Sequence, residues 1–365
     1  MKNLWDHKLA YRLKKSPLLL RVYSSQLLGL DSDLVLHGGG NTSVKINETN
    51  IFGEEEEILY VKGSGRNLAT IDTVDFTPLR LAHMKKLVEL MDISDTMLVR
   101  EQQLAMTHPE APRPSVESLL HAIIPFRWID HTHADAVVTL TNTPKGKKLI
   151  QNIYGNSFLI IPYVMPGFKL AQMVYEITKK VTWQQYEGMI LLNHGIISFG
   201  TEAHESYNRM INAVTLAEKY LKKFSSMPTN NFKKTTQVLK HETLRKLARI
   251  RKKVSIIRGS ASLARLNNNP EARFFSSLPN VKQISTRGPI TSDHLIRIKP
   301  SPVYIKHKNV EKDIEDFASK YVSYFDRHTD GKQTRLDSSP RWGVWSEEGI
   351  LFFGKNPDET ETISD

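Results

Sequence analysis

The stretch of residues 128–141 constrains the fold most, because it places two histidines beside a short apolar run. Its sequence is W-I-D-H-T-H-A-D-A-V-V-T-L-T, and the apolar, β-branched run 136–140 predicts a strand. Alternate side chains of a strand lie on one face, so His131 and His133, at the mouth of this run, are expected to point the same way. Two imidazoles that converge in this manner make half of a metal site.

Composition limits what kind of site this is. The 365 residues include no cysteine, which excludes disulfides, thiolate nucleophiles and sulfur-ligated zinc, so nitrogen and oxygen must hold any metal. No run of about 18 apolar residues occurs, and the N-terminal segment lacks the apolar core of a signal peptide. We therefore expect a cytoplasmic protein with no membrane partner, long enough for roughly two domains.

The net charge of +11 comes mostly from residues 222–299, where K-L-A-R-I-R-K-K-V at 246–254 is the densest basic run. A basic stripe can follow a phosphate backbone. No nucleic-acid motif accompanies it, however. We therefore favour a solvated helix face, or a surface that suits small anionic substrates, over a nucleic-acid partner.

Two glycine-rich turns follow apolar segments. Residues 34–46, L-V-L-H-G-G-G-N-T-S-V-K-I, predict a short strand, a three-glycine turn and a second strand that begins near Ser43. Residues 58–68, I-L-Y-V-K-G-S-G-R-N-L, predict a strand and a turn that carries Lys62, Ser64 and Arg66. Neither turn fits a dinucleotide or nucleoside triphosphate motif, and either alone is typical of a hairpin. Together they predict a cradle for one phosphate group.

Helical patterns surround these turns. Residues 8–30 predict a helix interrupted by Pro17, and residues 77–91 predict one with Thr77 as N-cap and Pro78 at its first position. Residues 113–125 predict a helix with Ser115 as N-cap, whose N-terminus is a further place for phosphate. Glu117 lies in its first turn, where it either complements the helix dipole or serves the nearby histidines.

A third histidine follows another apolar strand. Residues 188–200 read G-M-I-L-L-N-H-G-I-I-S-F-G and place His194 at the end of that strand, before a helix capped by Thr201. The alternation of strands and helices up to here predicts a layered α/β domain of about 225 residues. Farther on, the pattern predicts a helix over 310–325 and a hairpin over 340–354. Asp293 and His294 either reach the active site or have structural roles, and we favour the structural roles.

The segments H-G-G-G-N-T-S, V-K-G-S-G-R-N-L, R-P-S-V-E, D-H-T-H-A-D and L-N-H-G together resemble the class II aldolase and adducin family. The chain is most similar to the aldolase part of bifunctional rhamnulose-1-phosphate aldolase and short-chain dehydrogenase proteins, and the likeness continues through 285–299 and 340–354. Since a dehydrogenase domain follows in those relatives, we expect a stand-alone aldolase or a fragment.

The resemblance implies an α/β fold, namely a layered α/β/α domain whose central mixed, largely antiparallel sheet is flanked by helices, with a C-terminal α+β extension. It places the catalytic core at 1–230, a basic, mostly helical segment at 231–300 and the extension at 301–365.

The resemblance also implies a set of site residues. A divalent metal, zinc being the first expectation, would be held by His131, His133 and His194, and Glu117 would be the catalytic carboxylate. In some relatives a second serine directly precedes this glutamate, where this chain has Val116. The substrate phosphate would be held by Gly40, Asn41, Ser64, Gly65 and Ser115.

The activity implied is the reversible retro-aldol cleavage of a ketose 1-phosphate, such as rhamnulose 1-phosphate, to dihydroxyacetone phosphate and an aldehyde. A divalent cation would spread the charge of the enediolate, and Glu117 would transfer protons, particularly if burial raises its pKa towards neutrality. The family also implies a homo-oligomer, a tetramer, in which a neighbouring subunit often contacts the distal end of the sugar.

Three alternatives use the same fold. Sugar-phosphate epimerases of the family resemble a pattern with aspartate where this chain has Glu117. A methylthioribulose phosphate dehydratase shares the metal ligands and is excluded only weakly. Non-catalytic, adducin-like binding modules tend to lack the metal histidines, so the intact set favours an enzyme.

Overall fold

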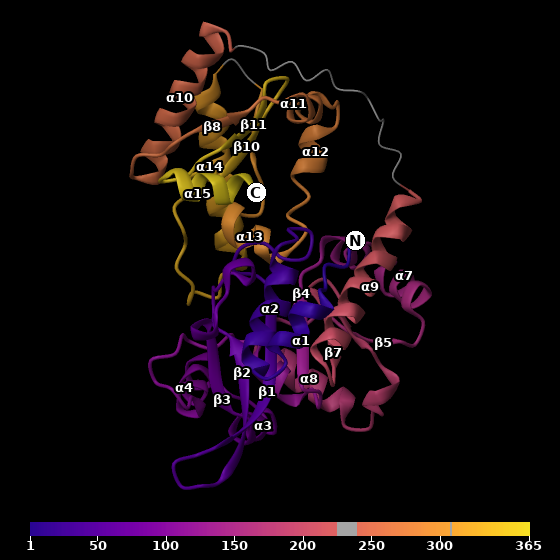
Figure 1. Cartoon of the computed structure of the whole chain (residues 1–365). Helices are drawn as coiled ribbons and strands as arrows, with labels where there is room; N and C mark the ends of the chain where they lie inside the picture. Colours follow the sequence, from indigo (N-terminus) through magenta and orange to yellow (C-terminus); the bar gives the residue numbers. More distant parts are fainter. Residues whose placement is uncertain (225–238, 307–308) are drawn as a thin grey trace. The chain divides into compact units, whose positions relative to one another are not determined.

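The computed structural model describes residues 1–224, 239–306 and 309–365, which form two compact units (Figure 1). The first unit is Met1–Ser226 with Ile290–Asp293, and the second is Met227–Pro289 with His294–Asp365. Residues 231–238 of the predicted basic segment lie outside the described residues, and the division at 230 and 300 stays a prediction. Within the described ranges, no helix is both long and apolar enough to cross a membrane.

The first unit is built on a seven-stranded sheet in the order β3-β2-β1-β4-β7-β6-β5. All neighbouring strands are antiparallel except β5 and β6, which are parallel. The predicted mixed, largely antiparallel sheet is therefore confirmed. Its strands are β1 Asn41–Thr49, β2 Glu55–Lys62, β3 Phe76–Arg80, β4 Trp128–Thr132, β5 Phe158–Ile161, β6 Gly188–Leu191 and β7 Gly195–Gly200.

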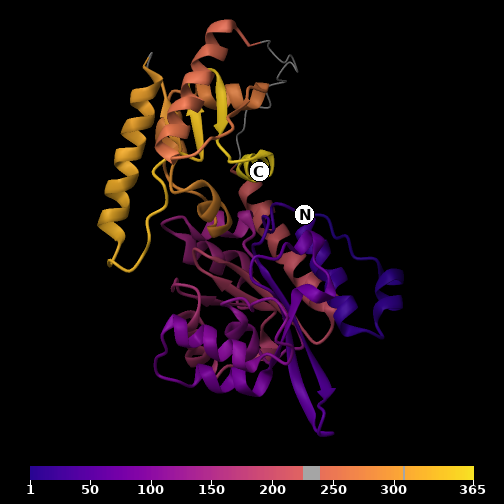
Figure 2. The same ribbon diagram turned by 90° about the vertical axis from the view of Figure 1, so that its left-hand side faces the viewer.

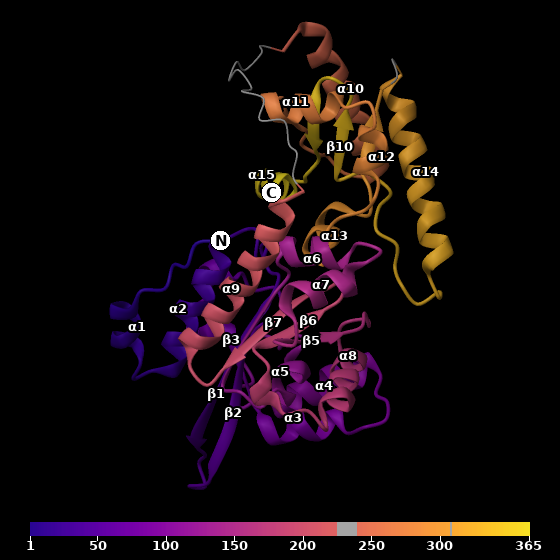
Figure 3. The same cartoon turned by 90° about the vertical axis from the view of Figure 1, so that its right-hand side faces the viewer.

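Helices cover both faces of this sheet, as Figure 3 shows. Successive residues of one strand, such as Ile196 and Ile197 of β7, belong to two different hydrophobic clusters, because side chains alternate across a strand. One cluster contains α1 His7–Leu13, α2 Pro17–Gly29, α6 Asp135–Thr141, α7 Gly146–Tyr154 and α9 Ala203–Lys222. The other contains α3 Leu81–Val88, α4 Asp95–Ala105, α5 Ser118–Ile123 and α8 Phe168–Thr178. Short 3-10 turns occupy Leu68–Thr70, Thr73–Asp75 and Trp183–Gln185.

The second unit has a four-stranded sheet in the order β8-β11-β10-β9, of which only β9 and β10 are parallel. The two long helices of this unit, α10 and α14, share one hydrophobic cluster with the sheet, and Figure 2 shows them from a second side. The predicted helix from residue 310 and the hairpin within 340–354 are both confirmed. The elements are α10 His241–Arg258, β8 Arg265–Asn267, α11 Pro270–Ser277, α12 Val281–Ser285, α13 Ser292–Ile298, β9 Val303–Ile305, α14 Val310–His328, β10 Trp342–Trp345, β11 Gly349–Phe352 and α15 Pro357–Ser364.

The predicted helix starts at Thr77 and Thr201 are wrong. Thr77 and Pro78 lie in β3, and the helix begins only at Leu81. Proline lacks a backbone N–H, but β3 is an edge strand of the sheet, where one missing ladder hydrogen bond is tolerated. Thr201 is not a cap either. The N-cap of α9 is Glu202, and the Thr201 hydroxyl instead donates to Glu205 at 3.0 Å.

The apolar run 136–140 was also assigned wrongly, because it lies in helix α6, whereas the strand is β4, which precedes it. Residues 34–36 likewise form no strand, and the chain enters the sheet at Asn41. A run of three to five apolar residues shows neither the helical nor the strand period, so its pattern cannot decide between them. The interruption at Pro17 is confirmed, since α1 ends before it and α2 begins at it.

Candidate metal centre

The three predicted histidines come together in the first unit. His131 lies in β4, His133 follows directly after that strand, and His194 lies in the turn between β6 and β7. Strands β4 and β7 are hydrogen-bonded neighbours, so the turn lies beside the end of β4. All three side chains are buried, and one ring nitrogen of each lies within 4.8 Å of those of the other two.

A glycine makes this approach possible. Gly195 follows His194, and a Cβ atom placed there would lie 2.4 Å from the carbonyl oxygen of Thr132 and 3.0 Å from the His131 ring. Both distances are shorter than van der Waals contact. Any side chain at this position would therefore push β4 and the turn apart.

The ring nitrogens that face one another carry lone pairs. The Nδ1 of His131 lies 3.0 Å from the carbonyl oxygen of Ile196, which can only accept, so the proton is on Nδ1 and Nε2 is bare. The Nδ1 of His133 donates to Asp293 at 2.9 Å, which leaves its Nε2 bare when the ring is neutral. The two Nε2 atoms are 3.1 Å apart. Since opposed lone pairs repel, this donor set fits a cation bound between them.

The pKa values of the two rings are shifted in opposite directions. Burial lowers the pKa of His131 to about 3, so this ring stays neutral, as a metal ligand must be. Burial acts on His133 in the same direction, but the hydrogen bond and charge of Asp293 outweigh it and raise the pKa of His133. A more basic imidazole is a stronger ligand.

Asp293 is the residue whose role the sequence-based interpretation missed. It was assigned a structural role, yet its Oδ1 accepts from His133 and its Oδ2 accepts from the backbone N–H of Leu36 at 3.3 Å. A Cβ atom at Gly39 would lie 2.0 Å from Oδ2, so the glycine turn makes room for this carboxylate. The only sequence signal for this role is the S-D-H within segment 285–299. This segment is so far along the chain from His133 that the sequence does not indicate the contact.

Glu117 points at the histidines. Its Oε1 lies 3.2 Å from Nε2 of His194, and its Oε2 lies 3.5 Å from Nε2 of His131. The amide nitrogen of Asn41 donates to Oε2 at 2.9 Å. This geometry favours a role beside the histidines over the helix-dipole interpretation.

The predicted cap at Ser115 is wrong. The helix α5 begins at Ser118 with Glu117 as its N-cap, and no side chain caps it. The Ser115 hydroxyl instead accepts from the Asn41 amide at 2.6 Å and from the backbone N–H of Glu117 at 3.2 Å. The segment before the helix turns tightly, and this turn places the Glu117 carboxylate beside the imidazoles.

The pKa of Glu117 is low, in contrast to the rise considered from the sequence. Burial alone would raise the pKa, but the imidazoles of His131, His194 and His133 outweigh burial and hold it well below its ordinary value. The Glu117 carboxylate is thus ionised in this structure.

The predicted phosphate residues lie on segments that touch one another, and Asn41 among them is the first residue of β1. The buried Lys62 ammonium donates to the carbonyl oxygens of Gly38 and Arg66, both at 2.8 Å, and so joins the two glycine turns. The backbone N–H of Ser64 donates to the carbonyl oxygen of Arg113 at 2.8 Å, which brings the second turn next to the segment that contains Ser115. The three predicted phosphate-binding segments are therefore neighbours in the first unit.

Two of these side chains have further constraints. The amide nitrogen of Asn41 donates to both Ser115 and Glu117, while its buried Oδ1 has no hydrogen-bond partner among the described residues. Ser64 and Gly65 are exposed, and Gly65 has a φ of +73°, which suits glycine. Burial lowers the pKa of Lys62 to about 8, although the charges of Glu117 and Asp293 oppose this shift.

A buried ion pair supports the strand β4. Arg21 of α2 donates to Asp130 at 2.5 Å, and both side chains are fully buried. The Ser206 hydroxyl donates to the second oxygen of Asp130 at 2.6 Å. Helices α2 and α9 thereby hold the strand that carries His131.

The fold and the site define a class of protein that comparison with known families identifies. Residues 21–221 match the class II aldolase and adducin N-terminal domain, and residues 241–365 match the second domain of class II aldolases. The chain belongs to the class II aldolase and adducin family, as predicted.

Individual relatives agree with this assignment. The uncharacterized oxidoreductase YuxG of Bacillus subtilis (strain 168) is 31% identical over 374 aligned positions, which cover 98% of this chain and 53% of that protein. This chain thus spans about half the length of that relative. The N-terminal class II aldolase domain of a conserved protein from Thermoplasma acidophilum is 38% identical with a TM-score of 0.55, covering 60% of this chain and 99% of that chain.

A more distant solved structure is l-fuculose-1-phosphate aldolase from Thermus thermophilus. It is 17% identical with a TM-score of 0.36, covering 56% of this chain and 95% of that chain. This likeness is too weak to carry an argument about activity. The activity is therefore argued from the residues of the site.

Proposed function

We propose that the protein is a metal-dependent aldolase that reversibly cleaves a ketose 1-phosphate, such as rhamnulose 1-phosphate, to dihydroxyacetone phosphate and an aldehyde. The observation that carries this proposal is the Glu117 carboxylate, which lies 3.2 Å from His194 and 3.5 Å from His131 beside the third imidazole. A carboxylate and three convergent imidazoles are what a site needs to hold a cation and move a proton at adjacent positions.

In this proposal each part of the site has its own task. His131, His133 and His194 hold a divalent metal, for which zinc suits three neutral nitrogen ligands. When bound, the cation supplies Lewis-acid stabilisation of negative charge on the substrate oxygens. The substrate phosphate is held by Gly40, Asn41, Ser64, Gly65 and Ser115.

Glu117 moves the proton. In the cleavage direction its carboxylate takes the proton from the hydroxyl of the carbon that becomes the aldehyde, while the carbon-carbon bond breaks. The electron pair of that bond stays on the dihydroxyacetone phosphate fragment, and the protonated Glu117 then returns its proton to that carbon. Asn41 donates to one carboxylate oxygen at 2.9 Å, which orients the carboxylate. The Glu117 carboxylate is ionised, as a group that accepts this proton must be.

The variant Glu117→Gln tests this role. It keeps the shape of the side chain and all three histidines, so we expect metal binding to persist while turnover falls about 10²- to 10⁴-fold, the range for loss of a general acid-base group. Release of dihydroxyacetone phosphate from ketose 1-phosphates is measured with and without chelator. The matched control is Glu110→Gln, an exposed glutamate of the same unit.

Two results would count against the proposal. Unchanged turnover in Glu117→Gln would remove the role assigned to the carboxylate. An epimeric sugar phosphate, or a dehydrated one, formed without dihydroxyacetone phosphate would identify an epimerase or a dehydratase on the same fold.

We also propose that the enzyme works as a homo-oligomer, a tetramer by analogy with the family. A neighbouring subunit would then contact the distal end of the sugar. Sedimentation velocity of the full chain measures the assembly, and a monomer with full activity would contradict it.

A further inference from the structure

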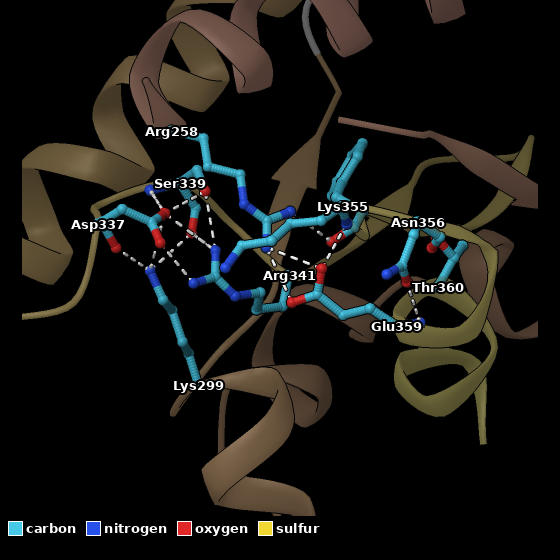
Figure 4. Close-up of polar contacts among 10 residues, drawn as sticks. Arg258, Lys299, Asp337, Ser339, Arg341, Lys355, Asn356, Glu359 and Thr360 are labelled. Atoms are coloured by element: carbon cyan, nitrogen blue, oxygen red, sulfur yellow. Dashed lines mark hydrogen bonds and ion pairs between the residues drawn. The ribbon is translucent and has the colours of Figure 1, made fainter. Parts of the chain in front are cut away.

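The second unit contains a cluster of cationic side chains that the proposed aldolase reaction does not use (Figure 4). Arg258 ends α10, Lys299 follows α13, and Arg341 precedes β10. Each of the three is less than one-tenth exposed. Burying a cation is unfavourable unless an anion or several acceptors compensate it, so the partners of these groups matter.

Two carboxylates pair with this cluster. Asp337 accepts from Nη1 of Arg341 at 2.9 Å and from Nη2 at 2.5 Å, which makes a bidentate pair. Glu359 accepts from Nη2 of Arg258 at 2.9 and 3.0 Å. Each arginine thus has one carboxylate of its own.

Lys299 has weaker compensation. Its ammonium donates to the backbone carbonyl oxygens of Asp337 and Ser339, lies 3.9 Å from the Asp337 carboxylate and lies 4.0 Å from the centre of the Tyr321 ring. The Asp337 carboxylate is already paired with Arg341. The lysine therefore brings a positive charge without a carboxylate of its own among the described residues.

A fourth cation lines a cavity beside this cluster. The cavity has a volume of about 430 Å³, and its charged lining consists of Arg297, Lys299, Arg341 and Glu359. The Nε of Arg297 is buried and has no hydrogen-bond partner among the residues that the structure describes. With Arg258 behind it, the site combines four basic side chains with two carboxylates in the described part of this unit, so basic groups outnumber acidic ones by two.

The remaining walls of the cavity are mostly apolar. Several of these side chains are unusually exposed for their type, among them Ile296 at 70% and Leu336 at 57%. Aromatic and aliphatic walls with a few convergent polar groups are typical of small-molecule sites, and 430 Å³ lies within their usual range. The apolar lining residues are Leu295, Ile296, Pro300, Tyr321, Tyr324, Leu336 and Ile363.

We propose that this cavity binds a small organic phosphate monoester, with the phosphate at Arg297 and Lys299 and the carbon body against the apolar walls. A phosphate monoester carries a charge of about −1.5 to −2 at neutral pH, which suits a site where basic side chains outnumber carboxylates. The planar guanidinium of Arg297 offers the Nε–H donor that such an oxygen acceptor needs.

The electrostatics of Lys299 support this site. Burial, together with the charges of Arg341 and Arg258, lowers the pKa of Lys299 to about 7. Burial is the largest cause and the charge of Asp337 opposes the shift, so an anion bound beside Lys299 would favour the protonated form of the lysine. All lining residues belong to the second unit, so the site is separate from the histidine site of the first unit.

Binding of phenyl phosphate to the full chain tests the proposal by isothermal titration calorimetry. The variant Arg297→Gln removes a cation that forms no ion pair within the described ranges, so the cluster behind it stays intact. We expect this change to weaken binding at least about tenfold, as for the loss of a charge-assisted hydrogen bond. The matched control is Arg251→Gln, an exposed arginine of α10, which should bind like the wild type.

A second control distinguishes phosphate binding in the second unit from phosphate binding in the first. The first unit has its own proposed phosphate residues, so Ser115→Ala is titrated in parallel and should retain the Arg297-dependent binding. Inorganic phosphate should bind more weakly than phenyl phosphate, because it leaves the apolar walls uncovered. Equal binding by Arg297→Gln and Arg251→Gln, or loss of all binding in Ser115→Ala, would overturn the proposal.

Discussion

The variant Asp293→Asn tests whether the carboxylate behind His133 supports metal binding. In the wild type, Oδ1 accepts from Nδ1 of His133 at 2.9 Å and Oδ2 accepts from the Leu36 N–H at 3.3 Å. An amide has the same shape but only one acceptor oxygen. Its NH₂ group must therefore face one of the two donors, so at least one hydrogen bond is lost together with the negative charge.

The size of the effect follows from the position of Asp293. Loss of the partner that orients a ligand histidine typically weakens metal binding about 10- to 100-fold, which corresponds to about 1.4 to 2.7 kcal/mol. The asparagine keeps the packing against Gly39, so the fold should persist.

Competition for Zn²⁺ between metal-free protein and a chromophoric chelator measures the dissociation constant without any substrate. The control is Asp33→Asn, which removes an exposed carboxylate of the same unit. Far-ultraviolet circular dichroism confirms that both variants are folded. If the two variants bind Zn²⁺ as tightly as each other, His133 does not depend on Asp293 and the reasoning fails. Because no turnover is measured, this outcome is independent of the aldolase proposal.

Three further predictions concern the support of the site and the stability of the first unit. Gly39→Ala should displace the Asp293 carboxylate, since the new Cβ would lie 2.0 Å from it, and should weaken Zn²⁺ binding in the same competition assay. Asp130→Asn should lower the free energy of unfolding in urea by about 3–5 kcal/mol, because it leaves the buried guanidinium of Arg21 without its anion. Burial lowers the pKa of Lys45 from its ordinary 10.5 to about 7, so between these values the unfolded chain binds more protons than the folded one, and stability should rise with pH across this window. This rise should be smaller in Lys45→Met, but it should not vanish, because Lys62 and Lys299 also have lowered pKa values of about 8 and about 7. Urea unfolding of both proteins at pH 7 and pH 10 checks the difference.

The grouping of the three histidines was predictable from local pattern. His131 and His133 are two residues apart at a strand end, and His194 lies in the short turn after an apolar strand, so each element by itself indicates where its imidazole lies. The prediction that they share a site needed only that the strands belong to one sheet, which the alternation of strands and helices indicates. The prediction is correct although the apolar run 136–140 is a helix. The strand is β4, which ends at Thr132, and the two histidines lie in it and directly after it.

The wrong boundaries have a different origin. A threonine followed by proline is a helix-start signal when the segment is considered alone, yet Thr77 and Pro78 pair with β2 at the edge of the sheet. Membership of an edge strand is set by tertiary pairing, and no property of the dipeptide reports it. The prediction that Ser115 caps a helix was wrong for the same reason. The Ser115 hydroxyl accepts a hydrogen bond from Asn41, which lies on a strand remote in sequence, and does not cap the helix.

Asp293 shows why the outer part of such a site is harder to predict than the inner part. Imidazoles that bind a metal must converge, so their spacing in the sequence carries information, whereas the carboxylate that orients one of them needs only to reach a single ring nitrogen. Asp293 does so from 160 residues beyond His133, in a four-residue segment that belongs to the first unit while its neighbours on both sides belong to the second. The sequence does indicate the space that the Asp293 carboxylate needs, because Gly39 has no side chain at the place where this carboxylate lies. A three-glycine turn beside predicted metal ligands therefore indicates either room for a side chain from elsewhere in the chain or a bound phosphate. The Gly39→Ala variant distinguishes these two roles, because it weakens binding of the metal in the first case and of the phosphate in the second.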